Sequence, residues 1–107
     1  MYELRIYSCM PGRMAEVMAR FDPEILELWS RHGIEQAGFW TVNVGPSNQD
    51  IYYMLKWDSL DERERRWTAF TNDPDMNDLR ARTEAQGPLL SNIQNIILKP
   101  TRFSSVQ

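Results

Sequence analysis

Apolar residues occupy every second position at the start of the chain, at Tyr2, Leu4 and Ile6. A period of two predicts a β-strand. After Pro11 and Gly12 the spacing of apolar residues changes to three and four, which predicts one face of an amphipathic helix. That face consists of Met14, Val17, Met18, Phe21, Ile25, Leu28 and Trp29. The chain therefore starts with a strand and a long helix.

Proline and glycine divide the next part of the chain. Pro23 lacks a backbone N–H and crowds the preceding turn, so it predicts a kink in the first helix. Gly33 predicts the end of that helix. Residues 34–44 are expected to be extended, and a turn separates them from a second extended segment, 51–57, which is apolar on both faces.

Two helix starts follow this segment. Ser59 with Glu62 forms a capping box, in which the hydroxyl accepts from a free N–H and the carboxylate reaches back to another. Asp73 and Pro74 predict a second start, with aspartate as N-cap and proline at the first helical position. We expect this second helix to continue to about Gln86.

Gly87 and Pro88 break the helical pattern, and residues 89–99 predict the last strand. The order is therefore β-α-β-β-α-β, which favours an α+β fold with a four-stranded antiparallel sheet covered by helices on one face. A strand with one face open to water should alternate between apolar and polar residues, but the segment 51–57 is apolar on both faces. We expect a second copy of the chain to cover the other face.

Chain length, charge and the length of the apolar runs restrict the number of domains and the classes of partner. With 107 residues the chain has the size of one domain, which we place at residues 1–100, followed by a tail at 101–107. The net charge is −3, and the arginines of residues 61–66 alternate with acids, so neither nucleic acid nor an anionic membrane is expected as a partner. Apolar runs such as 96–98 are too short to span a bilayer.

Cys9 is the only cysteine, which rules out an intrachain disulfide and a cysteine-based zinc cluster. The predicted strand at the start leaves no room for a targeting segment in this sequence. We therefore expect a cytoplasmic protein.

Several short motifs, spread over nearly the whole chain, resemble the NIPSNAP family of small α+β domains. They are Tyr2–Arg5, Pro11–Gly12, His32–Gly33, Gly45–Gln49, Leu60–Arg65, Asp73–Pro74 and Ile97–Pro100. The opening tetrapeptide and the Gly45–Gln49 turn together are the most specific of these. The resemblance implies a ferredoxin-like fold whose sheets pair across a two-fold axis into a dimeric α/β barrel.

A barrel of this kind has a small pocket, for which the sequence offers four candidate ligand-binding residues. Glu3, Arg5 and Tyr7 share one face of the first strand, and we expect charged side chains to avoid the helices, so this face should point into the barrel. Arg5 would then bind a carboxylate, with Tyr7 beside it. Trp40 and Tyr53, on neighbouring strands, would form aromatic walls. The alternative for Arg5 is an ion pair with Glu3 and no ligand.

The remaining charged residues have simpler interpretations. His32 is the only histidine and ends the first helix, where the helix dipole favours a cation, so we expect a role at the helix end rather than in catalysis. Without a second histidine or a paired cysteine we expect no metal site. Arg63, Arg65 and Arg66 are expected to form a solvated helix face with the acids around them.

Two functions are compatible with these observations. One is a homodimer that binds a small amphipathic or acidic molecule in the barrel cavity, without turnover. The alternative is an enzyme similar to the cofactor-independent monooxygenases, acting on an aromatic substrate in the same cavity. We expect no cofactor in either case. Haem-degrading relatives carry asparagine on the first strand, where this chain has Tyr7 and Ser8, and a histidine on the second helix, which is absent here.

Overall fold

The computed structural model describes residues 1–107 as a four-stranded antiparallel sheet with helices. The strands are β1 (Tyr2–Cys9), β2 (Glu35–Thr41), β3 (Asp50–Lys56) and β4 (Leu90–Leu98). The helices are α1 (Met14–Arg20), the π-helical turn η1 (Phe21–Ile25), α2 (Leu26–His32), α3 (Leu60–Thr71) and α4 (Pro74–Thr83). The strand order is β2-β3-β1-β4. The α+β class and the antiparallel sheet predicted from the sequence are confirmed.

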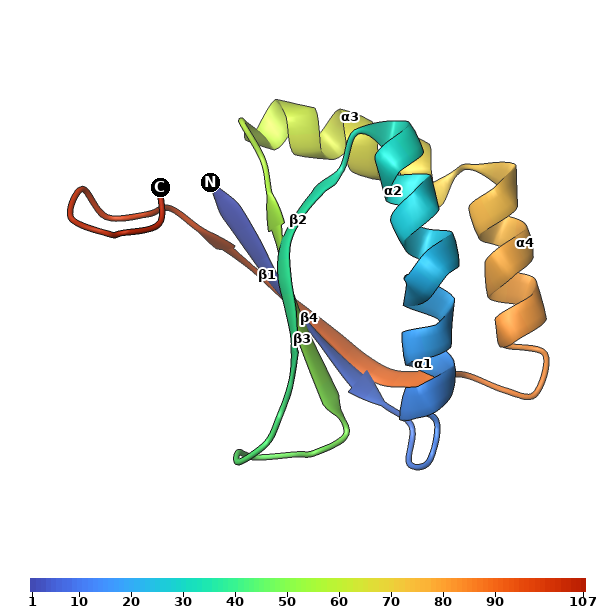
Figure 1. Cartoon of the computed structure of the whole chain (residues 1–107). Coiled ribbons are helices and arrows are strands. Elements are labelled where there is room, and N and C mark those ends of the chain that lie inside the picture. Colours follow the sequence, from blue (N-terminus) through green and yellow to red (C-terminus); the bar gives the residue numbers. More distant parts are fainter.

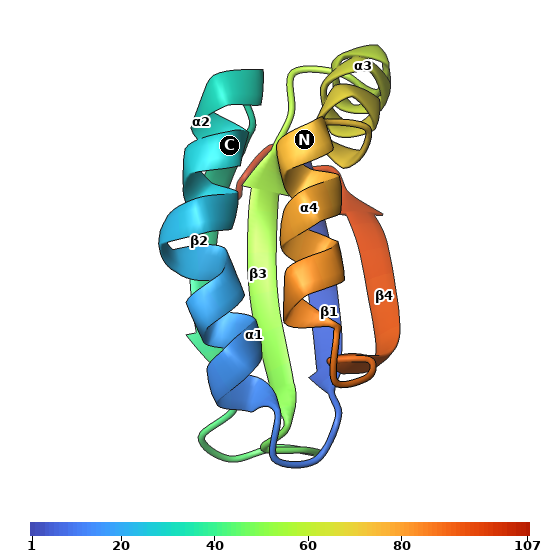
Figure 2. The same ribbon diagram turned by 90° about the vertical axis from the view of Figure 1, so that its right-hand side faces the viewer.

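The helices lie on one side of the sheet. Figure 1 shows α1, α2 and α4 to the right of the strands, with α3 across the end of the sheet. Seen from the helical side, α1 and α2 form one column in front of β2 and α4 forms a second column in front of β1, with β3 visible between them (Figure 2). The opposite face of the sheet carries no helix. None of the helices is both long and apolar enough to cross a bilayer.

The first helical region bends where the sequence predicts it. Asp22 has φ −116° and ψ 112°, which are not helical values, and it directly precedes Pro23. A proline ring excludes the helical conformation from the residue before it, which explains the break between α1 and α2. Gly33 ends α2 with φ 69° and ψ 28°, a left-handed conformation that glycine adopts without steric cost.

The two later helix starts are also confirmed. The Ser59 hydroxyl accepts from the Glu62 N–H at 3.0 Å. The Glu62 carboxylate accepts from the N–H of Asp58 at 2.5 Å, one residue earlier than the capping box predicts. Asp73 accepts from the backbone N–H of Asp75 at 2.9 Å, with Pro74 at the first position of α4. That helix ends at residue 83, three residues before the predicted end.

The strand register decides which side chains face the helices. Arg5 of β1 pairs with Tyr53 of β3, so the odd-numbered residues of both strands point to the same face. On β3 this is the fully buried face, formed by Ile51, Tyr53 and Leu55. The even-numbered residues of β3 lie on the helix-free face and are only partly buried.

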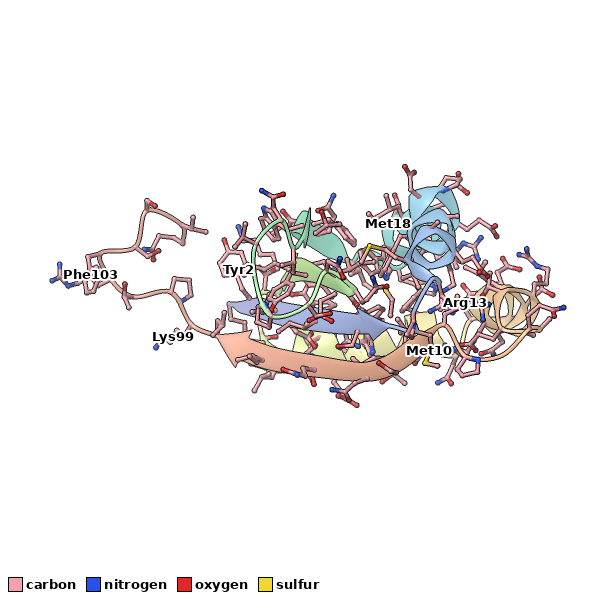
Figure 3. The ribbon with its side chains drawn as sticks, turned by 90° about the horizontal axis from the view of Figure 1, so that it is seen from below. Tyr2, Met10, Arg13, Met18, Lys99 and Phe103 are labelled. Atoms are coloured by element: carbon pink, nitrogen blue, oxygen red, sulfur yellow. The ribbon has the colours of Figure 1, made fainter.

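The last residues extend beyond the sheet. The Tyr2 hydroxyl donates to the carbonyl of Gln107 at 2.7 Å and holds the end of the tail. Phe103 lies at the far end of this segment, 82% exposed, and Figure 3 shows it projecting away from the rest of the chain.

Candidate functional site

A cavity of about 240 Å³ lies between the sheet and the helices. β1, β4 and every helical segment contribute to its walls, which are mostly apolar or aromatic. The apolar lining residues are Tyr7, Phe21, Ile25, Trp29, Trp67, Phe70, Met76, Leu90 and Ile93. The charged lining residues are Arg5, Arg20, Arg80 and Glu84, and Thr71 completes the wall. Three arginines thus face this space together with one carboxylate.

Arg5 of the cavity wall is paired with a buried carboxylate, that of Glu3. Glu3 has an exposed fraction of 0%. It accepts from Arg5 at 2.9 Å, from Trp57 at 3.1 Å and from Asn95 at 3.1 Å. Arg63 donates two further hydrogen bonds to it, at 2.8 and 3.0 Å. Arg63 therefore belongs to the core network and not to the solvated helix face predicted from the sequence.

This network fixes the charge states around Glu3. Burial opposes ionisation of the carboxyl, but the hydrogen bonds from Arg63 and Asn95 and the charge of Arg5 outweigh it and lower the pKa of Glu3 to about 2. The carboxylate therefore stays ionised inside the protein. Two arginines share this one carboxylate, so the cluster carries a net positive charge.

Arg5 is held between this carboxylate and aromatic rings. Its Nε donates to the Tyr53 hydroxyl at 2.8 Å, and its guanidinium lies 4.5 Å from the centre of the Trp67 ring. Burial alone would lower the pKa of Arg5, but the neighbouring Tyr53, Tyr7 and Glu3 raise it above its ordinary value. Burial also raises the pKa of Tyr53 well above its ordinary value, Tyr7 raises it further and Arg5 opposes this. The pair is thus a charged arginine and a neutral phenol.

The structure brings three of the four predicted ligand-binding residues together. The rings of Tyr7 and Tyr53 meet edge to face, with centroids 5.1 Å apart, and the guanidinium of Arg5 lies 5.7 Å from the Tyr7 ring. Arg5 and Tyr7 line the cavity, and Tyr53 packs behind them in the core. Trp40 is not part of this group. It pairs with Tyr52, lies on the helix-free face and is 52% exposed.

The predicted direction of Arg5 and Tyr7 was wrong. They face the helices instead of the helix-free side of the sheet, because the buried Glu3 carboxylate compensates the charge of Arg5 and Arg63 donates hydrogen bonds to that carboxylate. The ion pair of Glu3 and Arg5, the alternative considered from the sequence, is present within one chain at 2.9 Å.

Sequence reasoning missed two cavity residues with distinct chemistry. Trp67 was assigned to packing only, yet its ring covers the Arg5 guanidinium. Arg20 ends α1 within an ordinary helical pattern, and its side chain is nevertheless buried, with an exposed fraction of 6%. The one available signal was that Arg20 directly precedes Phe21 and lies three residues after Val17, two residues of the predicted apolar face.

His32 occupies the helix end predicted for it, outside the cavity lining. Its Nε2 lies 2.7 Å from the Asp73 carboxylate, which also accepts from Arg31 at 3.0 Å. The contact joins the end of α2 to the start of α4, which fits a structural role.

Comparison with solved structures identifies close matches in fold. A NIPSNAP family protein of Agrobacterium tumefaciens is 25% identical, with a TM-score of 0.87, over 99% of this chain and 97% of the other. A second NIPSNAP family protein of that organism, described as of unknown function, is 27% identical, with a TM-score of 0.85, over 99% and 92%. No curated protein matches the chain.

More distant structures share the fold alone. A cofactor-independent oxygenase of Streptomyces nogalater is 10% identical, with a TM-score of 0.59, over 96% of each chain. The sequence profile of the NIPSNAP family matches residues 2–105, nearly the whole chain. The protein therefore belongs to the NIPSNAP family.

Proposed function

We propose that the chain forms a homodimer and binds a small amphipathic acid in the cavity between its sheet and its helices. The observation that supports this most directly is the lining of the cavity, where aromatic and aliphatic walls surround three arginines and one carboxylate. Ligand pockets combine mostly apolar walls with a few polar groups that set the orientation. Arginine is well suited to carboxylates because its planar fork can donate two parallel hydrogen bonds.

Individual residues have separate roles in this proposal. Tyr7 and Trp67 flank the apolar body of the ligand, and Trp67 takes the place that the sequence assigned to Trp40. Arg5 contributes positive charge to the cavity wall. Tyr53 is buried behind Arg5 and orients its guanidinium through the 2.8 Å hydrogen bond rather than contacting the ligand.

The helix-free face of the sheet supports the homodimer. Leu4 and Ile6 of β1, Tyr52 and Met54 of β3 and Trp40 of β2 share this face by register. A sheet face that remains in water normally carries polar side chains, and a contiguous apolar face marks an interaction surface. A second copy provides a matching apolar face through a two-fold axis.

Oxidation of an aromatic substrate in the same cavity was the alternative predicted from the sequence. The likeness to the Streptomyces oxygenase, at 10% identity, is a likeness of fold, and one fold hosts many chemistries. The charges and walls of the cavity support binding of an acid directly, so binding is the function we propose.

The test is isothermal titration calorimetry with phenylacetate and hexanoate, each compared with its neutral amide. We expect the wild-type protein to bind at least one acid more tightly than the matching amide. Mass spectrometry of the denatured protein, purified under mild conditions, should show a small acid that co-purifies with it. Absence of binding by either acid, together with absence of a co-purified acid, would overturn the proposed ligand class.

A further inference from the structure

Two polar atoms in the walls of the cavity are buried without a hydrogen-bond partner. They are Nε of Arg20 on α1 and Nε1 of Trp29 on α2. Both side chains line the cavity, with exposed fractions of 6% for Arg20 and 2% for Trp29. Both atoms are N–H donors. A buried donor without an acceptor costs free energy, and each of these two donors lacks an acceptor within the chain.

The charge of Arg20 is also poorly compensated. Its Nη1 lies 3.4 Å from the Thr83 hydroxyl and 3.6 Å from the Glu84 carboxylate, and these distances are long for a hydrogen bond. A guanidinium offers five N–H groups. On Arg20, only Nη1 has partners in the chain, and the buried Nε has none. Arg5, in contrast, donates at 2.8 and 2.9 Å to Tyr53 and Glu3. Of these two cavity arginines, Arg20 is the one with an unpaired buried N–H donor.

We propose that Arg20 is the anchor for the carboxylate of the ligand and that this carboxylate takes the place of Glu84. The inference rests on the proposed function and adds to it the position of the head group. The ligand would be a monocarboxylic acid with its carboxylate at the α1–α4 end of the cavity. Its apolar body would then extend toward Tyr7 and Trp67.

Glu84 is suited to be displaced. It follows directly after the last residue of α4, and its side chain is 34% exposed, so it can turn into solvent without crossing the core. An incoming carboxylate restores the single negative charge opposite Arg20 and also buries an apolar body, which a rotated Glu84 side chain does not offer. The exchange leaves the net charge of the cavity unchanged, which favours a monoanion over a phosphate monoester of higher charge.

The decisive experiment compares phenylacetate with phenylacetamide by calorimetry on wild type and variants. Arg20→Met keeps much of the apolar stem and removes the charge. We expect it to weaken phenylacetate binding by about 10- to 100-fold, the range for a lost hydrogen bond to a charged group. Binding of the amide should stay within about twofold of wild type. Arg13→Met, at the N-cap of α1 and outside the cavity lining, is the matched control and should change neither affinity.

Glu84→Gln tests the exchange independently of the stability of the Arg20 variant. Removal of the internal competitor should strengthen phenylacetate binding by about three- to tenfold and leave amide binding unchanged. Equal acid affinity in wild type and in a folded Arg20→Met would overturn the anchor and leave the proposed function standing, as would an unaltered acid affinity in Glu84→Gln. A wild type that binds none of the acids would instead refute the proposed function itself.

Discussion

Arg63 of α3 donates two hydrogen bonds, of 2.8 and 3.0 Å, to the buried carboxylate of Glu3 on β1. This bidentate pair joins α3, which crosses the end of the sheet, to the central strand β1. It also satisfies the buried Glu3 carboxylate, which in turn compensates the charge of Arg5 in the core. A buried carboxylate is tolerated only where donors replace its water shell. The position of the cavity arginine thus depends on a residue nearly sixty positions away in the sequence.

Replacing Arg63 with methionine should therefore destabilise the fold. Glu3 would lose two of its hydrogen bonds while remaining buried, at a cost of about 2–3 kcal/mol. Urea denaturation gives the free energy of unfolding. Arg65→Met is the matched control on the same helix, because Arg65 is exposed and pairs only with Asp61, and it should change stability by less than about 0.5 kcal/mol. Equal losses in both variants would contradict the role given to the pair.

The buried carboxylate should also make stability depend on pH. The pKa of Glu3 is about 2 in the folded protein, below its ordinary value of 4.5, so its contribution is fully present above 4.5 and is lost as the pH falls toward 2. The contribution at neutral pH is on the order of 3 kcal/mol. Denaturation of the wild type and of Glu3→Gln, measured between pH 5 and pH 2.5, isolates the contribution of Glu3 to the free energy of unfolding. The variant should be less stable at neutral pH and should lose less stability across this acidic range. Parallel pH profiles would show that other carboxyls carry the effect.

Helix boundaries could be predicted because their causes are local. Ser59 caps α3 through a backbone N–H three residues away, and Gly33 ends α2 through its own backbone conformation. The kink before Pro23 likewise needs only the neighbouring residue. Such features require no knowledge of what packs above or below the chain.

The faces of the strands could not be assigned in the same way. Alternation separates Glu3 and Arg5 from their neighbours, but it does not say which set lies under the helices. The answer depends on Arg63 and Asn95, whose approach follows from tertiary packing. Trp40 illustrates the same difficulty. The register of β2 against β3 shifts between Gln36 and Phe39, and a change of one residue moves a side chain to the other face.

The N-cap of α3 offers a local test of stability. Ser59→Ala removes the acceptor for the Glu62 N–H and should cost about 1 kcal/mol in the free energy of unfolding. Ser30→Ala, an exposed position within α2, is the control and should have a smaller effect. Affinity for phenylacetate should stay the same in both, since neither residue lines the cavity. An unchanged melting temperature for Ser59→Ala would mean that the cap contributes nothing to the fold.

The helix-free face should be sensitive to charge. Met54→Asp places a carboxylate on this face, and a homodimer that buries the face should dissociate or become insoluble. Tyr53, one position earlier, cannot serve for this test because it lies in the core of the single chain. Analytical ultracentrifugation at micromolar concentration measures the outcome, with Ser30→Asp on the outer surface of α2 as the control. A wild-type protein that sediments as a folded monomer would refute the homodimer.

The contact between His32 and Asp73 should matter for stability and not for ligand binding. The hydrogen bond from His32 is the main reason that the pKa of Asp73 is lowered from its ordinary value of 3.8, with further help from the backbone N–H of Asp75 and from Arg31. The stabilising effect is therefore present above pH 3.8 and declines as the pH falls below it. His32→Gln should lower the melting temperature at neutral pH.

The same variant should bind phenylacetate with wild-type affinity, because His32 does not line the cavity. Arg31→Gln, which removes the exposed neighbour of His32 on the same carboxylate, is the matched control and should give the smaller change in melting temperature. Calorimetry measures acid affinity and thermal denaturation measures stability, so the two measurements separate a binding role of His32 from a structural one. A large loss of acid affinity in His32→Gln would show that the α2–α4 junction takes part in the binding site, because the cavity is closed by these same helices.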